Sequence, residues 1–149
     1  SLDMTDPSAS RAHWENRFQV PTADQLIAGV CRSLIPATDL SRRTLLEVES
    51  ASEAVQWRGV WHWTLVYATS ASEPGLAYII PDPSRPRLCI PFPESLLTEP
   101  AVKRLPKIVR DGLLAAPAVA GTCWPVWEIQ SKAQVTEVLS LLEFKPVSA

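Results

Sequence analysis

The chain has 149 residues, with 14 Lys and Arg against 16 Asp and Glu, 46 % hydrophobic residues, 14 Pro and 6 Trp. A net charge of −2 excludes a strongly basic nucleic-acid binder, and the hydrophobic content excludes intrinsic disorder. No apolar run approaches the roughly 20 residues of a membrane span, and no secretory signal is recognisable, so we expect a cytoplasmic globular protein that binds neither nucleic acid nor membrane.

The length fits one domain, since a chain of about 150 residues buries about 70 % of its unfolded surface without disulfides or metals. Residues 1–20 are expected to be a partly flexible N-terminal lead-in, and residues 21–147 a single α+β domain. Within the lead-in, Trp14 and Phe18 stand four residues apart, so they could hold a short helical turn against the body.

Two helices are predicted ahead of the first strand. Thr22 and Gln25 have the spacing of a capping box, and apolar residues then recur at helical intervals until Pro36 ends the run. Across residues 39–54 the apolar spacing favours a second helix, although residues 44–49 are also compatible with a short strand.

At residue 56 the hydrophobic period changes to two. The alternation of aromatic and β-branched residues over 56–67 predicts one long strand, with His62 on one side. The large residues expected on the other side are Trp57, Trp61, Trp63 and Tyr67. Polar, Pro-containing reversals at 70–75 and 81–86 then lead into strands at 76–80 and 87–92, which completes an antiparallel meander.

The last third of the chain is predicted to contain helix, strand and helix. The first helix begins near Pro100, and Pro106 either interrupts it or restarts it. Residues 122–130 form a strand in which Pro125 indicates an edge position or a bulge. A second capping box at 131–134 opens the final helix, which Pro146 closes.

This order of elements predicts an α+β fold. The expected architecture is a two-layer sandwich: an antiparallel sheet of about four strands (the meander plus one late strand) with helices packed on one face. An antiparallel sheet can leave its second face to water or to a partner.

The aromatic strand carries a resemblance to a known family. Trp57-x-Gly59-x-Trp61-x-Trp63, followed by Tyr78-Ile79-Ile80-Pro81 and the late Gly121-Thr122-Cys123-Trp124, resembles the bacterial domain-of-unknown-function family 3788. The likeness covers roughly residues 21–145, but the middle strands lack much of the family's Lys and Arg content. The architecture also looks like the wider YdhG-like group, whose fold resembles frataxin and which includes a proposed iron chaperone. The resemblance implies the fold and transfers no catalytic residue.

The aromatic residues are also the candidate binding residues. They are consistent either with a packed core or with the aromatic wall of a small-molecule pocket, in which His62 and Glu128 would supply polar groups. The candidate ligand-binding residues are Trp57, Trp61, His62, Trp63, Tyr67, Tyr78, Trp124, Trp127 and Glu128. The leading hypothesis is a non-enzymatic domain that binds a small molecule or a protein partner through its aromatic sheet.

Two other functions stay open. A small enzyme would need a site around His62 and Glu128, with Cys89 or Cys123, but no catalytic residue can be assigned from spacing. The three cysteines are expected to be buried thiols. A frataxin-like iron chaperone would need an acidic ridge, and the sequence offers only a small glutamate cluster at 47–53, so no metal or cofactor is expected.

A third hypothesis is an interaction protein that pairs a free strand edge with another chain. Pro91 and Pro125 are predicted to lie on the two edges and to blunt them, which argues against strand pairing. The sequence does not distinguish a monomer from a homodimer.

Overall fold

The computed structural model describes residues 13–69 and 75–144. The strands are β1 (Ser52–Trp57), β2 (Trp63–Ala68), β3 (Ala77–Ile80), β4 (Arg87–Cys89), β5 (Phe92–Pro93), β6 (Ala118–Val119), β7 (Thr122–Cys123) and β8 (Val126–Glu128). The α-helices are α2 (Ala23–Ala28), α3 (Ile35–Leu46), α4 (Lys107–Ala115) and α5 (Lys132–Leu139). Short 3-10 helices are η2 (Arg32–Leu34), η3 (Gly59–Trp61), η4 (Glu94–Leu96), η5 (Pro100–Arg104) and η6 (Ser140–Glu143).

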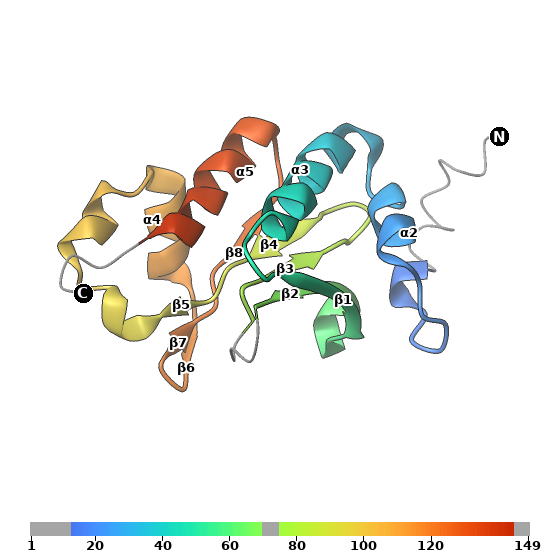
Figure 1. The fold of residues 1–149 in the computed structure, drawn as a ribbon, viewed down its shortest axis with the longest axis horizontal. Helices are drawn as coiled ribbons and strands as arrows, with labels where there is room; N and C mark the ends of the chain where they lie inside the picture. Colours follow the sequence, from blue (N-terminus) through green and yellow to red (C-terminus); the bar gives the residue numbers. More distant parts are fainter. Residues whose placement is uncertain (1–12, 70–74, 145–149) are drawn as a thin grey trace.

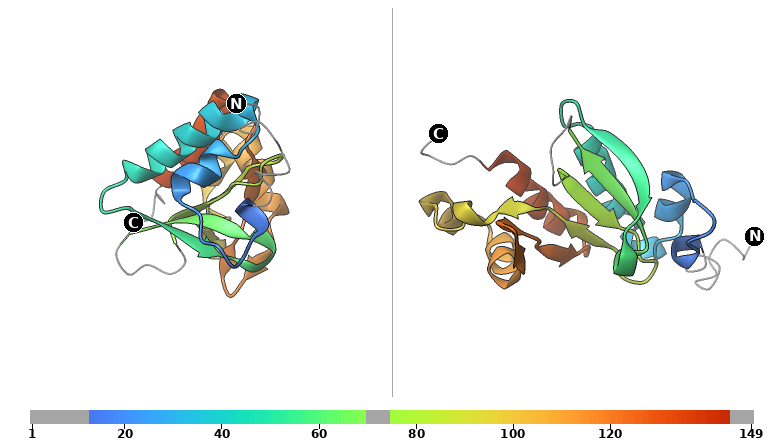
Figure 2. Two further views of the ribbon diagram at one scale, coloured as in Figure 1. Left: turned by 90° about the vertical axis from the view of Figure 1, so that its right-hand side faces the viewer. Right: turned by 90° about the horizontal axis from the view of Figure 1, so that it is seen from below.

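The architecture is α+β and roughly two-layered, as predicted. A five-stranded antiparallel sheet has the order β1-β2-β3-β4-β8, and a small three-stranded sheet has the order β5-β7-β6 (Figure 1). Helix α3 packs against α5, α2 and strand β3, and α4 packs against α5. The views in Figure 2 show α3 and α5 over one face of the large sheet, with the strands in front when the molecule is seen from below. Within the described ranges, no helix has the length and apolar character of a membrane span.

The predicted long strand over 56–67 is wrong, because this segment is a hairpin. Strand β1 turns through η3 into β2, and Trp57 pairs directly with Trp63. Gly59 adopts a left-handed φ of 58° at the start of η3, and the N–H of Arg58 donates to the carbonyl of His62 at 2.9 Å across the turn. The aromatic alternation continues through the turn, so periodicity alone cannot reveal the reversal. This hairpin adds the fifth strand to the sheet.

The N-terminal helices also differ from the prediction. The capping box is confirmed, because Gln25 N–H donates to Thr22 Oγ1 and Thr22 N–H donates to Gln25 Oε1. The helix it opens ends at Ala28, and Pro36 lies in the first turn of α3 instead of closing a helix. A proline in the first turn sacrifices no helical hydrogen bond. The favoured helix over residues 39–54 is confirmed as far as Leu46, where α3 ends, but β1 begins at Ser52; the alternative strand over 44–49 does not form.

Prolines divide the late segment more finely than the sequence predicts. Leu105 is extended with ψ 153°, which separates η5 from α4. Pro125 separates β7 from β8, so residues 122–130 contribute strands to two different sheets. Ser131 caps α5, because its Oγ accepts from the N–H of Gln134 at 3.1 Å. The predicted capping box is incomplete, because Gln134 Oε1 accepts from the N–H of Gln130 and not of Ser131. Residues 70–74 of the predicted reversal, and the predicted helix end at Pro146, lie outside the described residues.

The segment that contains Trp14 and Asn16 is fixed to the sheet by two hydrogen bonds that involve Trp63. The indole Nε1 of Trp14 donates to the carbonyl of Trp63 at 3.1 Å, and Trp63 Nε1 donates to the carbonyl of Asn16 at 2.7 Å. Trp14 is therefore only 3 % exposed, whereas Phe18 is 95 % exposed. The expected role of Phe18 in holding this segment is wrong.

A polar cluster joins helices α2 and α3 to strands β1 and β2. Arg42 binds Glu53 with two hydrogen bonds of 2.8 and 3.0 Å and also contacts Asp24 at 2.6 Å. The hydroxyl of Tyr67, which is fully buried, donates to Glu53 at 2.6 Å. Burial opposes ionisation of Glu53, but the hydrogen bonds from Arg42 and Tyr67 outweigh it and hold its pKa below the usual value. Burial and the Glu53 carboxylate raise the pKa of Tyr67.

Helix α4 approaches β8 closely at Gly112. A Cβ atom at this position would lie 2.7 Å from Cζ2 of Trp127 and closer still to the indole nitrogen. The indole Nε1 of Trp127 donates to the carbonyl of Ile108 at 3.0 Å. Glycine is therefore required here by close packing, not by backbone conformation.

Candidate functional site

The large sheet divides the predicted aromatic row between its two faces. Side chains alternate along each strand, and cross-strand partners point to the same face. The candidates packed in the core beneath the helices are Trp57, Trp63, Tyr67 and Trp127. On the opposite face, Tyr78 lies with its partners Val66 and Cys89. Trp124 packs against them, and so does Trp61, which also contacts the core cluster. We call this second surface, made by Arg58, Trp61, Val66, Tyr78, Cys89 and Trp124, the aromatic face.

Three rings form a continuous row across the aromatic face. The ring centroids of Trp61 and Trp124 each lie 5.9 Å from that of Tyr78, with interplanar angles of 55° and 46°. Tyr78 is only 2 % exposed, and both indoles are half-buried. The hydroxyl of Tyr78 also accepts a 3.0 Å hydrogen bond from the N–H of Gly75, which fixes the Tyr78 ring. The indoles therefore cover a rigid Tyr78 and present their outer surfaces to solvent.

Arg58 adds a positive charge to this row. Its guanidinium carbon lies 5.0 Å from the centroid of the Tyr78 ring, within the range of a cation–π interaction. Arg58 is exposed, and its Nη1 donates to Gln56 Oε1 at 3.4 Å. Because a guanidinium keeps several donors, the side chain retains the capacity to bind an acceptor group of a ligand.

Cys89 lies in the floor of the aromatic face and is unsuited to nucleophilic chemistry. Burial raises the pKa of its thiol to about 12, although the charge of Arg58 opposes the shift. Cys123 is also buried, with its pKa raised by burial. The expectation of buried thiols is right for these two and wrong for Cys31, which is exposed. A hydrogen bond from Ser33 lowers the pKa of Cys31.

The structure does not bring His62 and Glu128 together. His62 precedes β2 and Glu128 lies on β8, with β3 and β4 between them, which separates their backbones by roughly 14 Å. The imidazole of His62 lies between Trp14 and Trp57, with ring centroids 4.5 and 5.1 Å away. Its buried Nδ1 has no hydrogen-bond partner in the part of the chain that the structure describes. Glu128 is exposed.

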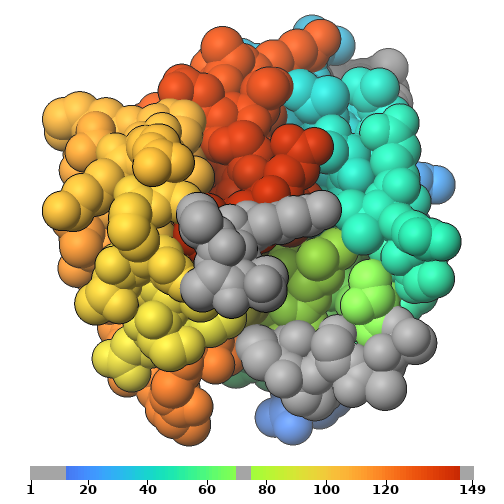
Figure 3. All heavy atoms as spheres, turned by 60° about the vertical axis from the view of Figure 1, so that its left-hand side comes forward, coloured from blue at the N-terminus to red at the C-terminus, as the bar shows by residue number. Residues whose placement is uncertain are grey.

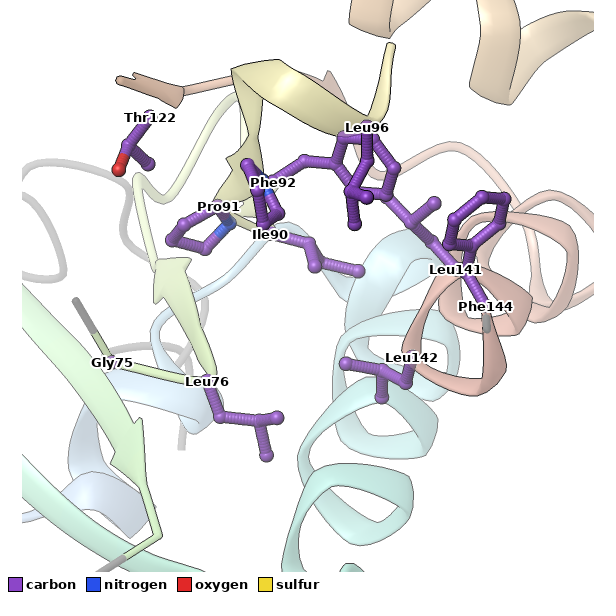
Figure 4. Close-up of a pocket in the computed structure, with 11 residues that line it drawn as sticks. Gly75, Leu76, Ile90, Pro91, Phe92, Leu96, Thr122, Leu141, Leu142 and Phe144 are labelled. Atoms are coloured by element: carbon purple, nitrogen blue, oxygen red, sulfur yellow. The ribbon is translucent and has the colours of Figure 1, made fainter. Parts of the chain in front are cut away.

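An apolar hollow lies elsewhere, beside β5 and the C-terminal helices. It has a volume of about 390 Å³ and an apolar lining that includes Leu76, Phe92, Leu96, Leu142 and Phe144 (Figure 4). Figure 3 looks onto this side of the molecule, with the yellow atoms of β5 and η4 at the lower left and the red atoms of α5 and η6 above them. A second hollow of about 370 Å³ lies between α3 and the α5–η6 segment. Neither hollow is lined by any of the nine candidate residues.

Sequence reasoning missed Arg58 and the apolar hollow. Arg58 directly precedes Gly59, and a glycine after a strand is a turn signal that would have placed Arg58 at a strand end. The hollow is lined by residues from distant parts of the chain, for which no sequence signal exists. No three His, Cys, Asp or Glu side chains within residues 13–69 and 75–144 are grouped to hold a metal ion.

Comparisons of the chain with protein-family models, with curated proteins and with solved structures found no match.

Proposed function

We propose that this chain is a non-enzymatic binding domain and that its ligand docks on the aromatic face. The observation that carries the proposal is the arrangement of Trp61 and Trp124 on either side of the buried Tyr78, with Arg58 above the ring. Since Tyr78 and the sheet fix the two indoles, binding requires little ordering of side chains.

The chemistry of this surface favours a particular class of ligand. Indole surfaces stack on flat apolar or π-bonded groups, and exposed aromatic surfaces are common in recognition sites. Arg58 would pair with an anionic or hydrogen-bond-accepting substituent at the edge of the stacked group. We therefore propose a small molecule or partner segment with a planar apolar group and an adjacent acceptor.

Two further expectations stay with this proposal. Membership of family 3788 stays a proposal that rests on the sequence resemblance alone. An enzyme built on His62 and Glu128 is the alternative function, and the separation of these residues across the sheet disfavours it. A cytoplasmic location belongs to the same proposal.

The probe that tests the proposal is 1-anilinonaphthalene-8-sulfonate, which combines a planar aromatic group with an anionic acceptor. We expect saturable binding to the folded protein, measured by probe fluorescence. The Trp61→Ala/Trp124→Ala variant should weaken it at least about tenfold, because two stacking surfaces are removed. Arg58→Gln should weaken binding severalfold. The dissociation constant of this variant should also rise less steeply with added salt than that of the wild type.

Leu114→Ala is the matched control, because Leu114 is 75 % exposed and lies on α4, a helix that packs on the core cluster through Val109 and Leu113. It should leave the dissociation constant unchanged. Arg58 is exposed, so its variant tests the site even if the double tryptophan variant is unstable. Equal affinity of wild type and Arg58→Gln, at low and at high salt, would contradict the proposal.

A further inference from the structure

The apolar hollow beside β5 is built from segments that lie far apart in the sequence (Figure 4). Residues 75–76 precede β3, and residues 90–93 and 96 lie between the end of β4 and the end of η4. Residue 122 belongs to β7, and residues 141, 142 and 144 lie in or next to η6. The predicted position of Pro91 on an edge of the large sheet is wrong, because Pro91 lies between β4 and β5 and lines this hollow.

The hollow reaches the core, and its mouth is lined by half-buried apolar side chains. Ile90, Phe92 and Leu141 are at most 4 % exposed and belong to the main core cluster. The rings of Phe92 and Phe144 meet edge to face with centroids 5.2 Å apart, which fixes one wall. Large lining residues that are half-buried and pack on the same cluster are Leu76, Leu96, Leu142 and Phe144. Apolar surface gathered in one concave place is typical of a ligand site.

The chemistry of the lining favours a neutral molecule. Among the residues that the structure describes, no lining side chain is charged, and only Thr122 has a polar side chain, whose hydroxyl can both donate and accept. Pro91 and Pro93 have no N–H, so the main chain only accepts hydrogen bonds at these positions. A charged group placed here would lose its water against apolar side chains and would find no opposite charge in the lining.

The volume limits the size of the molecule. The hollow measures about 390 Å³, near the lower end of the roughly 300–1,000 Å³ that ligand pockets span. A water molecule takes up roughly 30 Å³ in the liquid, so the hollow has space for about a dozen non-hydrogen atoms. A linear alcohol of about ten carbon atoms matches this size.

We propose that the apolar hollow binds one neutral aliphatic molecule of this size, such as a medium-chain alcohol. The hydrocarbon body of the ligand removes the half-buried leucine and phenylalanine side chains of the mouth from water, which supplies the driving force. A hydroxyl group suits the hydrogen-bonding groups of the lining better than a carboxylate, because the proline positions offer acceptors only. This inference does not depend on the ligand of the aromatic face, because none of the nine candidate residues lines the hollow.

n-Decanol is the probe that tests the inference. Decanoate is its matched control, because the two molecules have chains of equal length and only decanoate is charged at neutral pH. Binding to the full chain is followed by two-dimensional NMR of the leucine methyl groups. We expect the signals of Leu76, Leu96 and Leu142 to shift and saturate with n-decanol, whereas that of Leu26 on α2 stays in place. The dissociation constant of decanoate should be at least about tenfold larger.

Leu96→Trp and Leu97→Trp form a matched pair of variants. Both leucines are half-buried and pack on the core cluster, but of these two only Leu96 lines the hollow. The indole in Leu96→Trp takes up part of the space, so this variant should bind n-decanol at least about tenfold more weakly. Leu97→Trp should bind like the wild type, and both variants should keep the circular dichroism of the folded protein.

Three results would overturn the inference. The first is a wild-type titration in which the leucine signals of the lining stay in place up to the solubility limit of n-decanol, whether or not the variants fold. The second is equal dissociation constants for n-decanol and decanoate, because the lining would then not select a neutral molecule. The third is loss of n-decanol binding in Trp61→Ala/Trp124→Ala, which would move this ligand to the aromatic face. We expect unchanged n-decanol affinity in that variant.

Discussion

Replacing Gly112 by Ala is expected to destabilise the protein by about 3 kcal/mol, because the added methyl group overlaps the Trp127 indole and disturbs its hydrogen bond to Ile108. Helix propensity predicts the opposite sign, since Ala is favoured over Gly within a helix by about 1 kcal/mol. Close packing wins because the overlap involves a rigid ring that is 5 % exposed and held on both sides by the core.

The free energy of unfolding from urea titration measures this effect. Leu114→Ala is the control on the same helix and should change stability by less than about 0.5 kcal/mol, because Leu114 is exposed. In a Trp127→Leu background, which removes the obstructing ring, Gly112→Ala should cost much less. Stabilisation by Gly112→Ala in the wild-type background would contradict the described packing of α4 on β8.

Replacing Glu53 by Gln is expected to destabilise the protein by about 2 kcal/mol at neutral pH. The substitution removes the charge that Arg42 binds with two hydrogen bonds, and it leaves a guanidinium that is only 20 % exposed without that partner. Asp39→Asn is the matched control, because it breaks the exposed ion pair with Arg43 and should cost less than about 0.5 kcal/mol. Equal effects of the two variants on the urea midpoint would contradict the role of this cluster.

Wild type and Glu53→Gln should also differ in how their free energies of unfolding depend on pH. The pKa of Glu53 is lower in the folded state, so the unfolded state binds its proton more readily. The stabilisation is complete above the unfolded pKa of about 4.3 and is lost as the pH falls through the folded pKa. The stability difference between wild type and Glu53→Gln should therefore shrink below about pH 4. A difference that stays constant between pH 7 and pH 3 would show that the charge does not contribute.

Local signals in the sequence were sufficient for several elements of the fold. The capping hydroxyls of Thr22 and Ser131 and the apolar period of α5 depend on neighbours within one turn, and the structure confirms them. The α+β class follows from the order of such elements. Pro36 shows where such local signals fail. A proline is compatible both with the end of one helix and with the first turn of the next, so the sequence alone does not decide between them.

The candidate site was predictable in composition but not in arrangement. Trp61, Tyr78 and Trp124 were all among the candidates, yet sequence alternation placed Trp61 on the same side as Trp57 and Trp63. The turn at Gly59 takes Trp61 out of the strand and against Tyr78, whereas Trp63 and Tyr67 stay on the same face as Trp57, and alternation cannot report such a local change. The approach of Trp124 to Tyr78 depends on tertiary packing between segments far apart in the chain, which a single sequence does not encode locally.

The most direct test of the aromatic face as a binding surface is 19F NMR of protein labelled with 5-fluorotryptophan. Its six tryptophan signals are assigned by single Trp→Phe substitutions and followed during titration with 1-anilinonaphthalene-8-sulfonate. We predict that the signals of Trp61 and Trp124 shift and saturate together, while those of Trp14, Trp63 and Trp127 stay in place. The apolar hollow is lined by no tryptophan, so binding there would leave all signals unmoved. Unmoved Trp61 and Trp124 signals at saturation of the probe would contradict the account.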